Sequence, residues 1–120
     1  MGKLLGKNVL LVEDEPIVAM LVEDMLMGLG ANVIGPAAQV GEAVAMARRE
    51  QLDAAVLDVK LGSDSSAEVA EILREREIPY VLATGLDTPA DPRDANAPLL
   101  QKPYLQEDLA RALEQALAND

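Results

Sequence analysis

Short apolar runs alternate with amphipathic stretches along the whole chain. Five runs rich in Val, Leu and Ala start near residues 8, 32, 54, 79 and 98, and they have the length of buried strands. Between them, apolar residues recur at three- and four-residue spacing, as in helices that cover a sheet with one face. The alternation predicts an α/β fold with a parallel sheet between two layers of helices.

The sequence marks the predicted helices with different clarity. The first should begin at Pro16, which suits an opening helical turn, and end at Gly28 and Gly30. Two shorter apolar stripes, around residues 40–47 and 69–73, predict the next two helices. The last helix has the cleanest apolar face, predicted to consist of Leu105, Leu109, Ala112, Leu113, Ala116 and Leu117.

The segment at residues 85–98 breaks the pattern where a fourth of five helices would belong. It contains three prolines and three aspartates. Prolines remove backbone donors and push the preceding residues out of helical geometry. We therefore expect a functional loop with at most one helical turn, so that the fourth helix is short or disordered.

Composition narrows the classes of partner. The 120 residues suit one domain, and the formal charge of −11 opposes binding to nucleic acids and to anionic membranes. The aromatic residues are two tyrosines, Tyr80 and Tyr104, so stacking on single strands is not expected. No apolar stretch approaches the ~20 residues that cross a bilayer, and no signal peptide is evident, so we expect a cytoplasmic protein.

Four of the predicted strands end on chemically useful side chains. The first runs into Glu13 and Asp14, the third ends at Asp58, the fourth at Thr84, and Lys102 follows the fifth. Because the carboxyl ends of parallel strands meet at one edge of a sheet, these residues should share one crevice.

The combination of residue types points to phosphoryl transfer. Three crowded carboxylates repel one another unless a cation intervenes, and Mg²⁺ prefers such oxygen ligands. Lys102 and the Thr84 hydroxyl could bind phosphate oxygens, and Asp58 is a possible nucleophile. Each residue alone has a simpler explanation, such as a helix cap, a turn or a solvated lysine. Those explanations fail jointly, because they leave the shared sheet edge to chance.

These motifs resemble the receiver domain of two-component response regulators. The resemblance rests on the run 9–16 (Val-Leu-Leu-Val-Glu-Asp-Glu-Pro), Asp58, the pair Thr84-Gly85 and the pair Lys102-Pro103. It covers essentially the whole chain. It implies a doubly wound, flavodoxin-like (βα)5 fold with strand order 2-1-3-4-5, and one CheY-like receiver domain over residues 1–120 without an output domain.

The resemblance also implies a role for each site residue. Asp58 would be the phosphoacceptor, and Asp14, Asp58 and the backbone carbonyl of Lys60 would bind Mg²⁺. Glu13 would hold a metal-bound water. Thr84 and Lys102 would bind the phosphoryl oxygens, and the bond from Lys102 to the following proline would be cis.

Two departures from the usual pattern of the receiver family suggest a subgroup of that family. The aromatic switch residue that the family has three positions before the lysine is replaced by Leu99. Together with the proline-rich segment, Pro79 and residues 83–85, this resembles the alphaproteobacterial single-domain subgroup named for its Phe-Ala-Thr-Gly motif, although Leu82 stands in the place of Phe. Members of that subgroup often work with HWE-type histidine kinases.

The resemblance implies a phosphorylation-dependent signalling module, expected to be a monomer. It would take a phosphoryl group from a sensor histidine kinase onto Asp58 and signal through protein contacts, or act as a phosphate sink or relay. It would not be an enzyme beyond its self-catalysed phosphotransfer and autodephosphorylation. One alternative is a receiver that belongs to a larger hybrid kinase or regulator, and another is an unphosphorylated binding domain. An aspartyl-phosphate hydrolase is disfavoured, because it needs a second carboxylate where this chain has Lys60.

Overall fold

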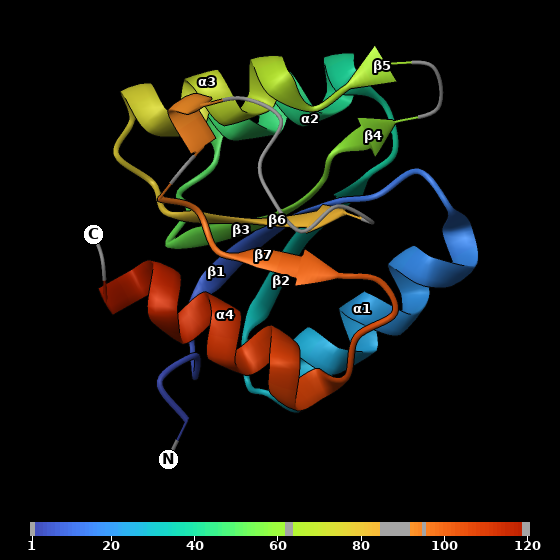
Figure 1. The fold of residues 1–120 in the computed structure, drawn as a ribbon, viewed down its shortest axis with the longest axis vertical. Helices are drawn as coiled ribbons and strands as arrows, with labels where there is room; N and C mark the ends of the chain where they lie inside the picture. Colours follow the sequence, from blue (N-terminus) through green and yellow to red (C-terminus); the bar gives the residue numbers. More distant parts are fainter. Residues whose placement is uncertain (1, 62–63, 85–91, 95, 119–120) are drawn as a thin grey trace.

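The computed structural model describes residues 2–61, 64–84, 92–94 and 96–118. Within them, a central sheet of five parallel strands has the order β2-β1-β3-β6-β7 (Figure 1). This confirms the predicted order 2-1-3-4-5 and the flavodoxin-like fold. The strands are β1 (Asn8–Val12), β2 (Asn32–Ala37), β3 (Ala54–Asp58), β6 (Tyr80–Thr84) and β7 (Leu99–Gln101).

Helices cover both faces of the sheet, and the sheet separates two apolar cores. In Figure 1, α2 (Val40–Arg49) and α3 (Ala67–Glu75) lie above the sheet, and α1 (Pro16–Gly28) and α4 (Gln106–Ala118) lie below it. Leu10, Leu57 and Leu73 belong to the core beneath α2 and α3. Leu26 and Leu113 belong to the opposite core. The central strands are therefore buried on both sides, which explains their continuous apolar runs.

The helix boundaries agree with the sequence pattern except at the last helix. Pro16 occupies the first position of α1, and Gly30, with φ of +85°, lies just beyond its end. Leu105 was expected on the buried face of the last helix, and this is wrong. It precedes α4, its backbone N–H donates to the Asp108 carboxylate at 2.9 Å, and it is 63% exposed. The bond resembles half of a capping box, so the helix starts one residue later.

Two features lie in the connections. A short antiparallel hairpin of β4 (Lys60–Leu61) and β5 (Asp64–Ser65) follows β3, which the sequence did not predict. After β6, residues Pro92–Asp94 form the 3-10 helix η1, in keeping with at most one helical turn. The rest of that prediction, a short or disordered fourth helix, falls on residues 85–91 and 95, which lie outside the described residues.

Two peptide bonds that precede prolines are cis in the described part of the chain. The bond from Lys102 to Pro103 is cis, as predicted, and the bond from Gly35 to Pro36 is also cis. Among the described helices, none has the length and apolar character needed to cross a membrane.

Candidate functional site

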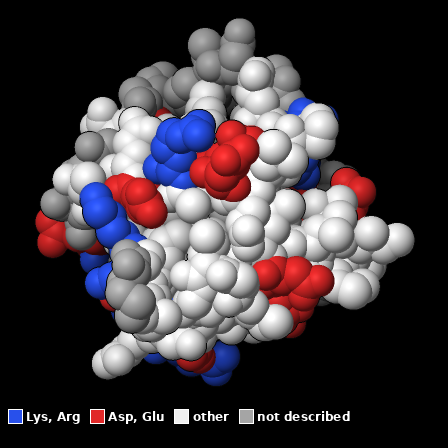
Figure 2. Space-filling view, turned by 90° about the horizontal axis from the view of Figure 1, so that it is seen from below, with Lys and Arg blue, Asp and Glu red and all other residues white. Residues whose placement is uncertain are grey.

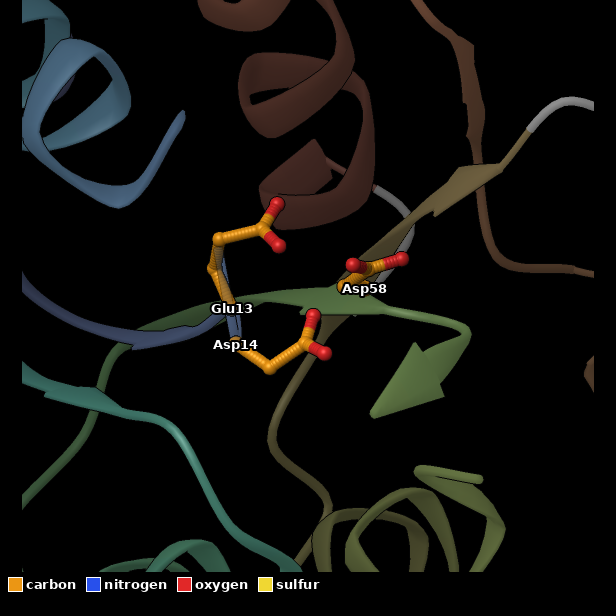
Figure 3. Close-up of side chains that lie close together, drawn as sticks. All are labelled: Glu13, Asp14 and Asp58. Carbon is orange, nitrogen blue, oxygen red and sulfur yellow. The ribbon is translucent and has the colours of Figure 1, made fainter. Parts of the chain in front are cut away.

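Three carboxylates meet at the carboxyl edge of the sheet. Glu13 and Asp14 follow β1, and Asp58 ends the neighbouring strand β3, with Val12 paired to Leu57. One oxygen of each carboxylate lies within 4.8 Å of the others, and Figure 3 shows the three groups gathered in the space between the two strand ends. The predicted convergence of these strand ends is therefore present in the structure.

Lys102 faces this acidic group. Lys102 Nζ lies 3.1 Å from Asp58 Oδ2 and 3.3 Å from Glu13 Oε1. Its backbone N–H donates to the Thr84 carbonyl at 3.1 Å, which holds the residue at the end of β6. The sequence did not indicate the contact with Glu13, because the resemblance assigned Glu13 to the metal and Lys102 to the phosphoryl group.

Burial and neighbouring charges shift the pKa values of Glu13 and Lys102. Burial, a hydrogen bond with Asp58 and the Asp58 charge raise the pKa of Glu13 to about 7, although the Glu15 N–H and Lys102 oppose the shift. Burial alone would lower the pKa of Lys102, but its hydrogen bond with Asp58 and the charges of Asp58 and Glu13 outweigh burial and raise it. Lys102 is therefore held in its cationic form, while burial and the neighbouring Asp58 favour the protonated form of Glu13.

The backbone after β3 and the end of β6 complete the surroundings of Asp58. The Lys60 N–H donates to Asp58 Oδ1 at 3.4 Å, and the hairpin that begins at Lys60 holds this stretch in place. The Lys60 side chain is exposed. Thr84 is buried at the end of β6, directly after Ala83, which pairs with Asp58. All six residues expected at the site therefore lie at this edge of the sheet.

Tyr104 is a neighbour that the sequence analysis did not assign to the site. Burial, together with the charges of Glu13 and Asp58, raises its pKa to about 12, although Lys102 opposes the shift. The phenol therefore stays neutral at physiological pH. An aromatic residue directly after the Lys-Pro pair was the signal that could have identified it.

The acidic group borders a cavity and suits a hard cation. A cavity of about 400 Å³ beside Asp14 is lined by the α2 N-terminus and the β4–β5 hairpin, including Gln39, Val40, Leu61 and Asp64. Oxygen ligands at this spacing fit Mg²⁺. Zn²⁺ sites usually contain histidine or cysteine, and the chain has neither. The residues at the site therefore fit a magnesium ion.

The family follows from comparison with known sequences. The profile of the response regulator receiver domain matches residues 9–114. The chain belongs to this family. Receiver domains are signalling proteins rather than metabolic enzymes, they bind Mg²⁺ at their acidic site, and they work with histidine kinases through protein contacts. In this receiver, Leu99 stands where the family has an aromatic residue, and it is partly buried against the core beneath α2 and α3.

Solved structures and a curated relative support the assignment. SdrG from Sphingomonas melonis Fr1 is 40% identical, with a TM-score of 0.80 over 96% of this chain and 98% of that chain. The receiver domain of the sensor histidine kinase PA1611 from Pseudomonas aeruginosa PAO1 is 28% identical, with a TM-score of 0.80 over 94% and 98% of the two chains. That structure has a magnesium ion coordinated in its active site cleft. The regulator PhyR of Methylorubrum extorquens is 32% identical over 118 residues, which cover 94% of this chain and 44% of PhyR. The receiver thus spans less than half of that relative.

Proposed function

We propose that this receiver accepts a phosphoryl group from a kinase histidine onto Asp58 in a Mg²⁺-dependent reaction. The observation that carries the proposal is the position of Asp58. Its carboxylate lies 3.1 Å from the Lys102 ammonium and belongs to the same cluster as Glu13 and Asp14. A nucleophile, a fixed cation and candidate metal ligands are the parts that phosphoryl transfer needs.

The chain's own residues suggest how the transfer is assisted. An Asp58 oxygen forms the new P–O bond while the N–P bond of the phosphohistidine breaks, and the histidine nitrogen keeps the bonding electrons. The Lys60 N–H, 3.4 Å from Asp58 Oδ1, helps to orient the carboxylate. Lys102 and the Thr84 hydroxyl would bind the phosphoryl oxygens as the acyl phosphate forms.

We assign the metal to the acidic side of the site. Asp14, Asp58 and the Lys60 backbone carbonyl would hold Mg²⁺, and Glu13 would hold one of its waters. When bound, the ion supplies positive charge that offsets both the carboxylates and the phosphoryl oxygens. The raised pKa of Glu13 agrees with this assignment, because it reflects a buried carboxyl group beside the negative charge of Asp58, which a bound cation would offset.

The enzymology that we propose is limited to forming and hydrolysing the receiver's own acyl phosphate. A hydrolase with an aspartyl-phosphate intermediate would need an acid two residues after the nucleophile. Lys60 stands at that position, and its side chain is exposed. The site therefore favours a signalling receiver, which holds its phosphoryl group long enough to change its affinity for a partner or to pass the group on.

The kinase partner is proposed to bind α1. Large apolar side chains are exposed on this helix, which begins two residues after Asp14: Ile17 is 71% exposed and Met20 is 56% exposed. Figure 2 views the molecule from the side on which α1 and α4 lie, and uncharged residues make up most of that surface. Such a surface suits the apolar side of a helical partner, and we propose a kinase of the HWE type.

A charge placed on α1 separates docking from chemistry. Met20→Glu should slow transfer from a phosphorylated kinase but leave labelling by a small phosphodonor unchanged, because the exposed side chain is not part of the site. Rates of both reactions would be measured on the same preparation. Equal rates of kinase transfer for the variant and the unmodified receiver would show that the kinase does not dock on this part of α1.

We further propose that the receiver acts as a cytoplasmic monomer. Histidine kinases draw on cytoplasmic ATP, and a formal charge of −11 opposes self-association. Sedimentation velocity with and without a small phosphodonor would detect a dimer.

The acceptor role is tested with a small phosphodonor and intact-protein mass spectrometry. Acetyl phosphate and Mg²⁺ should add one phosphoryl mass, and hydroxylamine should remove it, as expected of an acyl phosphate. Asp58→Asn should abolish the labelling, whereas Asp53→Asn, which changes an aspartate at the opposite end of β3, should not. Unchanged labelling of the Asp58 variant would refute the assignment.

A further inference from the structure

A second polar cluster lies at the opposite end of β6 from Thr84. Asp94 Oδ1, in η1, accepts hydrogen bonds from the Tyr80 hydroxyl and from Arg74 Nη1, each at 2.5 Å. Arg74 Nη1 also lies 2.8 Å from the Tyr80 hydroxyl. The three side chains come from α3, the first residue of β6 and the segment that leads to β7. They therefore join three elements that are distant in sequence.

The cluster is buried enough to hold its members firmly. Asp94 is 8% exposed and Tyr80 is 7% exposed. Burial, followed by the hydrogen bond with Asp94, raises the pKa of Tyr80 to about 12, so its hydroxyl remains a donor. Removing either donor would leave a buried carboxylate with fewer partners, which is unfavourable. Asp94 is therefore fixed against α3 and β6.

β7 begins five residues after Asp94. The Asp94 carbonyl accepts from the Ala97 N–H at 2.9 Å, and the Pro98 carbonyl accepts from the Leu82 N–H at 3.0 Å. Leu99–Gln101 then pair with β6, and Lys102 follows. Asp94 is thus fixed before the start of β7, and Lys102 contacts Asp58 just after its end.

The strand itself offers little to fix its own register. β7 has three residues and is the last strand in the sheet order, so among the described strands it pairs with β6 alone. A shift by one residue would move the backbone by about 3.3 Å and turn every side chain to the other face. The Lys102 ammonium would then leave its position 3.1 Å from Asp58 Oδ2. The bond of the Lys102 N–H to the Thr84 carbonyl and the burial of Leu100 oppose that shift, and an anchor outside the strand would oppose it further.

We propose that Arg74, Tyr80 and Asp94 are positioning residues that fix the register of β7 and thereby hold Lys102 against Asp58. The proposal rests on the proposed function, because it matters for the reaction only if Lys102 binds the phosphoryl group there. The cluster does not touch the reacting atoms and acts solely through the backbone of residues 97–102.

Arg74 and Arg76 provide a matched pair of variants for the test. Arg76 follows α3 and donates to the Ala47 and Glu50 carbonyls at the end of α2, and so it tethers a different element. Arg74→Gln, Asp94→Asn and the control Arg76→Gln would be compared in two measurements on the full chain. One is the initial rate of Asp58 labelling by acetyl phosphate with Mg²⁺. The other is the NMR shift of the Lys102 amide and ammonium groups without a phosphodonor.

The expected pattern separates positioning from general destabilisation. Arg74→Gln and Asp94→Asn should slow labelling about tenfold, since small misplacements of a binding group have large effects on rate, and should shift both Lys102 signals. Arg76→Gln should keep the labelling rate within about twofold and leave the Lys102 signals in place. This should hold even if its melting temperature falls as much as that of Arg74→Gln or Asp94→Asn. Unmoved Lys102 signals, an unchanged rate in the two cluster variants, or an equal effect of Arg76→Gln would each overturn the proposal.

Two further features keep the test decisive. If the unmodified receiver is not labelled at all, the proposed function fails, whereas the Lys102 signals still report the register of β7 separately. If Asp94→Asn does not fold, Tyr80→Phe removes one hydroxyl while retaining the ring. It should shift the Lys102 signals in the same direction as Arg74→Gln, and a shift in neither variant would refute the positioning role.

Discussion

Replacing Glu13 with glutamine should stabilise the metal-free receiver, and the gain should grow with pH. Glu13 is 4% exposed, and burial together with the neighbouring Asp58 raises its pKa from 4.5 to about 7. Folding therefore favours the protonated carboxyl group. The stability that Glu13 contributes is fully present below pH 4.5 and is lost as the pH rises through 7. Glutamine has a similar shape but does not ionise, so the variant should not lose this stability as the pH rises.

The size of the effect follows from the two pKa values. The Glu13 pKa is 4.5 in the unfolded chain and about 7 in the folded protein. Linkage between these two pKa values lowers the free energy of unfolding by about 1 kcal/mol at pH 5 and by about 3 kcal/mol at pH 8, relative to the fully protonated protein. The difference in the free energy of unfolding between Glu13→Gln and the unmodified protein should therefore grow by about 2 kcal/mol from pH 5 to pH 8. Other titrating groups are common to both proteins, so they largely cancel in this difference.

Urea titrations followed by far-UV circular dichroism would measure the difference, because the chain has no tryptophan for fluorescence. They would be run with EDTA at pH 5, 6, 7 and 8. Glu23→Gln on α1 removes a carboxylate outside the site and is the matched control for the substitution itself. A Glu13→Gln difference that does not change with pH, or that shows the variant less stable at pH 8, would refute the argument from buried charge.

Other predictions address the metal, the core and the tyrosines. At pH 8, Mg²⁺ should raise the melting temperature of the unmodified receiver but hardly that of Asp14→Asn, and equal increases would place the ion elsewhere. Leu113→Ala, at a side chain with 0% exposure, should cost about 2–5 kcal/mol in urea unfolding, whereas Leu105→Ala should cost less than about 0.5 kcal/mol. Ultraviolet titration should find the pKa of both Tyr80 and Tyr104 near 12, above the usual 10. The contribution of Tyr80 to stability should be complete below pH 10 and lost as the pH rises through 12. A pKa near 10 for either would contradict its burial.

The sheet and the site edge were predictable because they depend on local patterns. Strands buried on both faces, such as β1 and β3, appear as continuous apolar runs, and a parallel sheet then brings their ends together whatever the side chains are. Glu13, Asp14 and Asp58 were found in this way, with no knowledge of tertiary contacts. The resemblance to a known family added the strand order and the cis bond before Pro103, both of which are confirmed.

The features that were missed depend on long-range side-chain contacts. In the sequence, Arg74 is only one of several charges on the polar side of a helix, and Asp94 is one of three aspartates among prolines. Their contact spans twenty residues and forms because η1 returns to the start of β6. The pairing of Glu13 with Lys102 spans 89 residues. No periodic pattern carries such information, because side-chain partners are selected only after the elements have packed.

The most direct test locates the phosphoryl group on the chain. After a short reaction with acetyl phosphate and Mg²⁺, borohydride reduction converts a phosphorylated aspartate to homoserine, which tandem mass spectrometry of the peptides can place. We predict homoserine at position 58 and at no other aspartate, with the yield lost when Lys102 is replaced by methionine. Homoserine at Asp14 or Asp64 instead of Asp58, or full labelling without Lys102, would contradict the central claim.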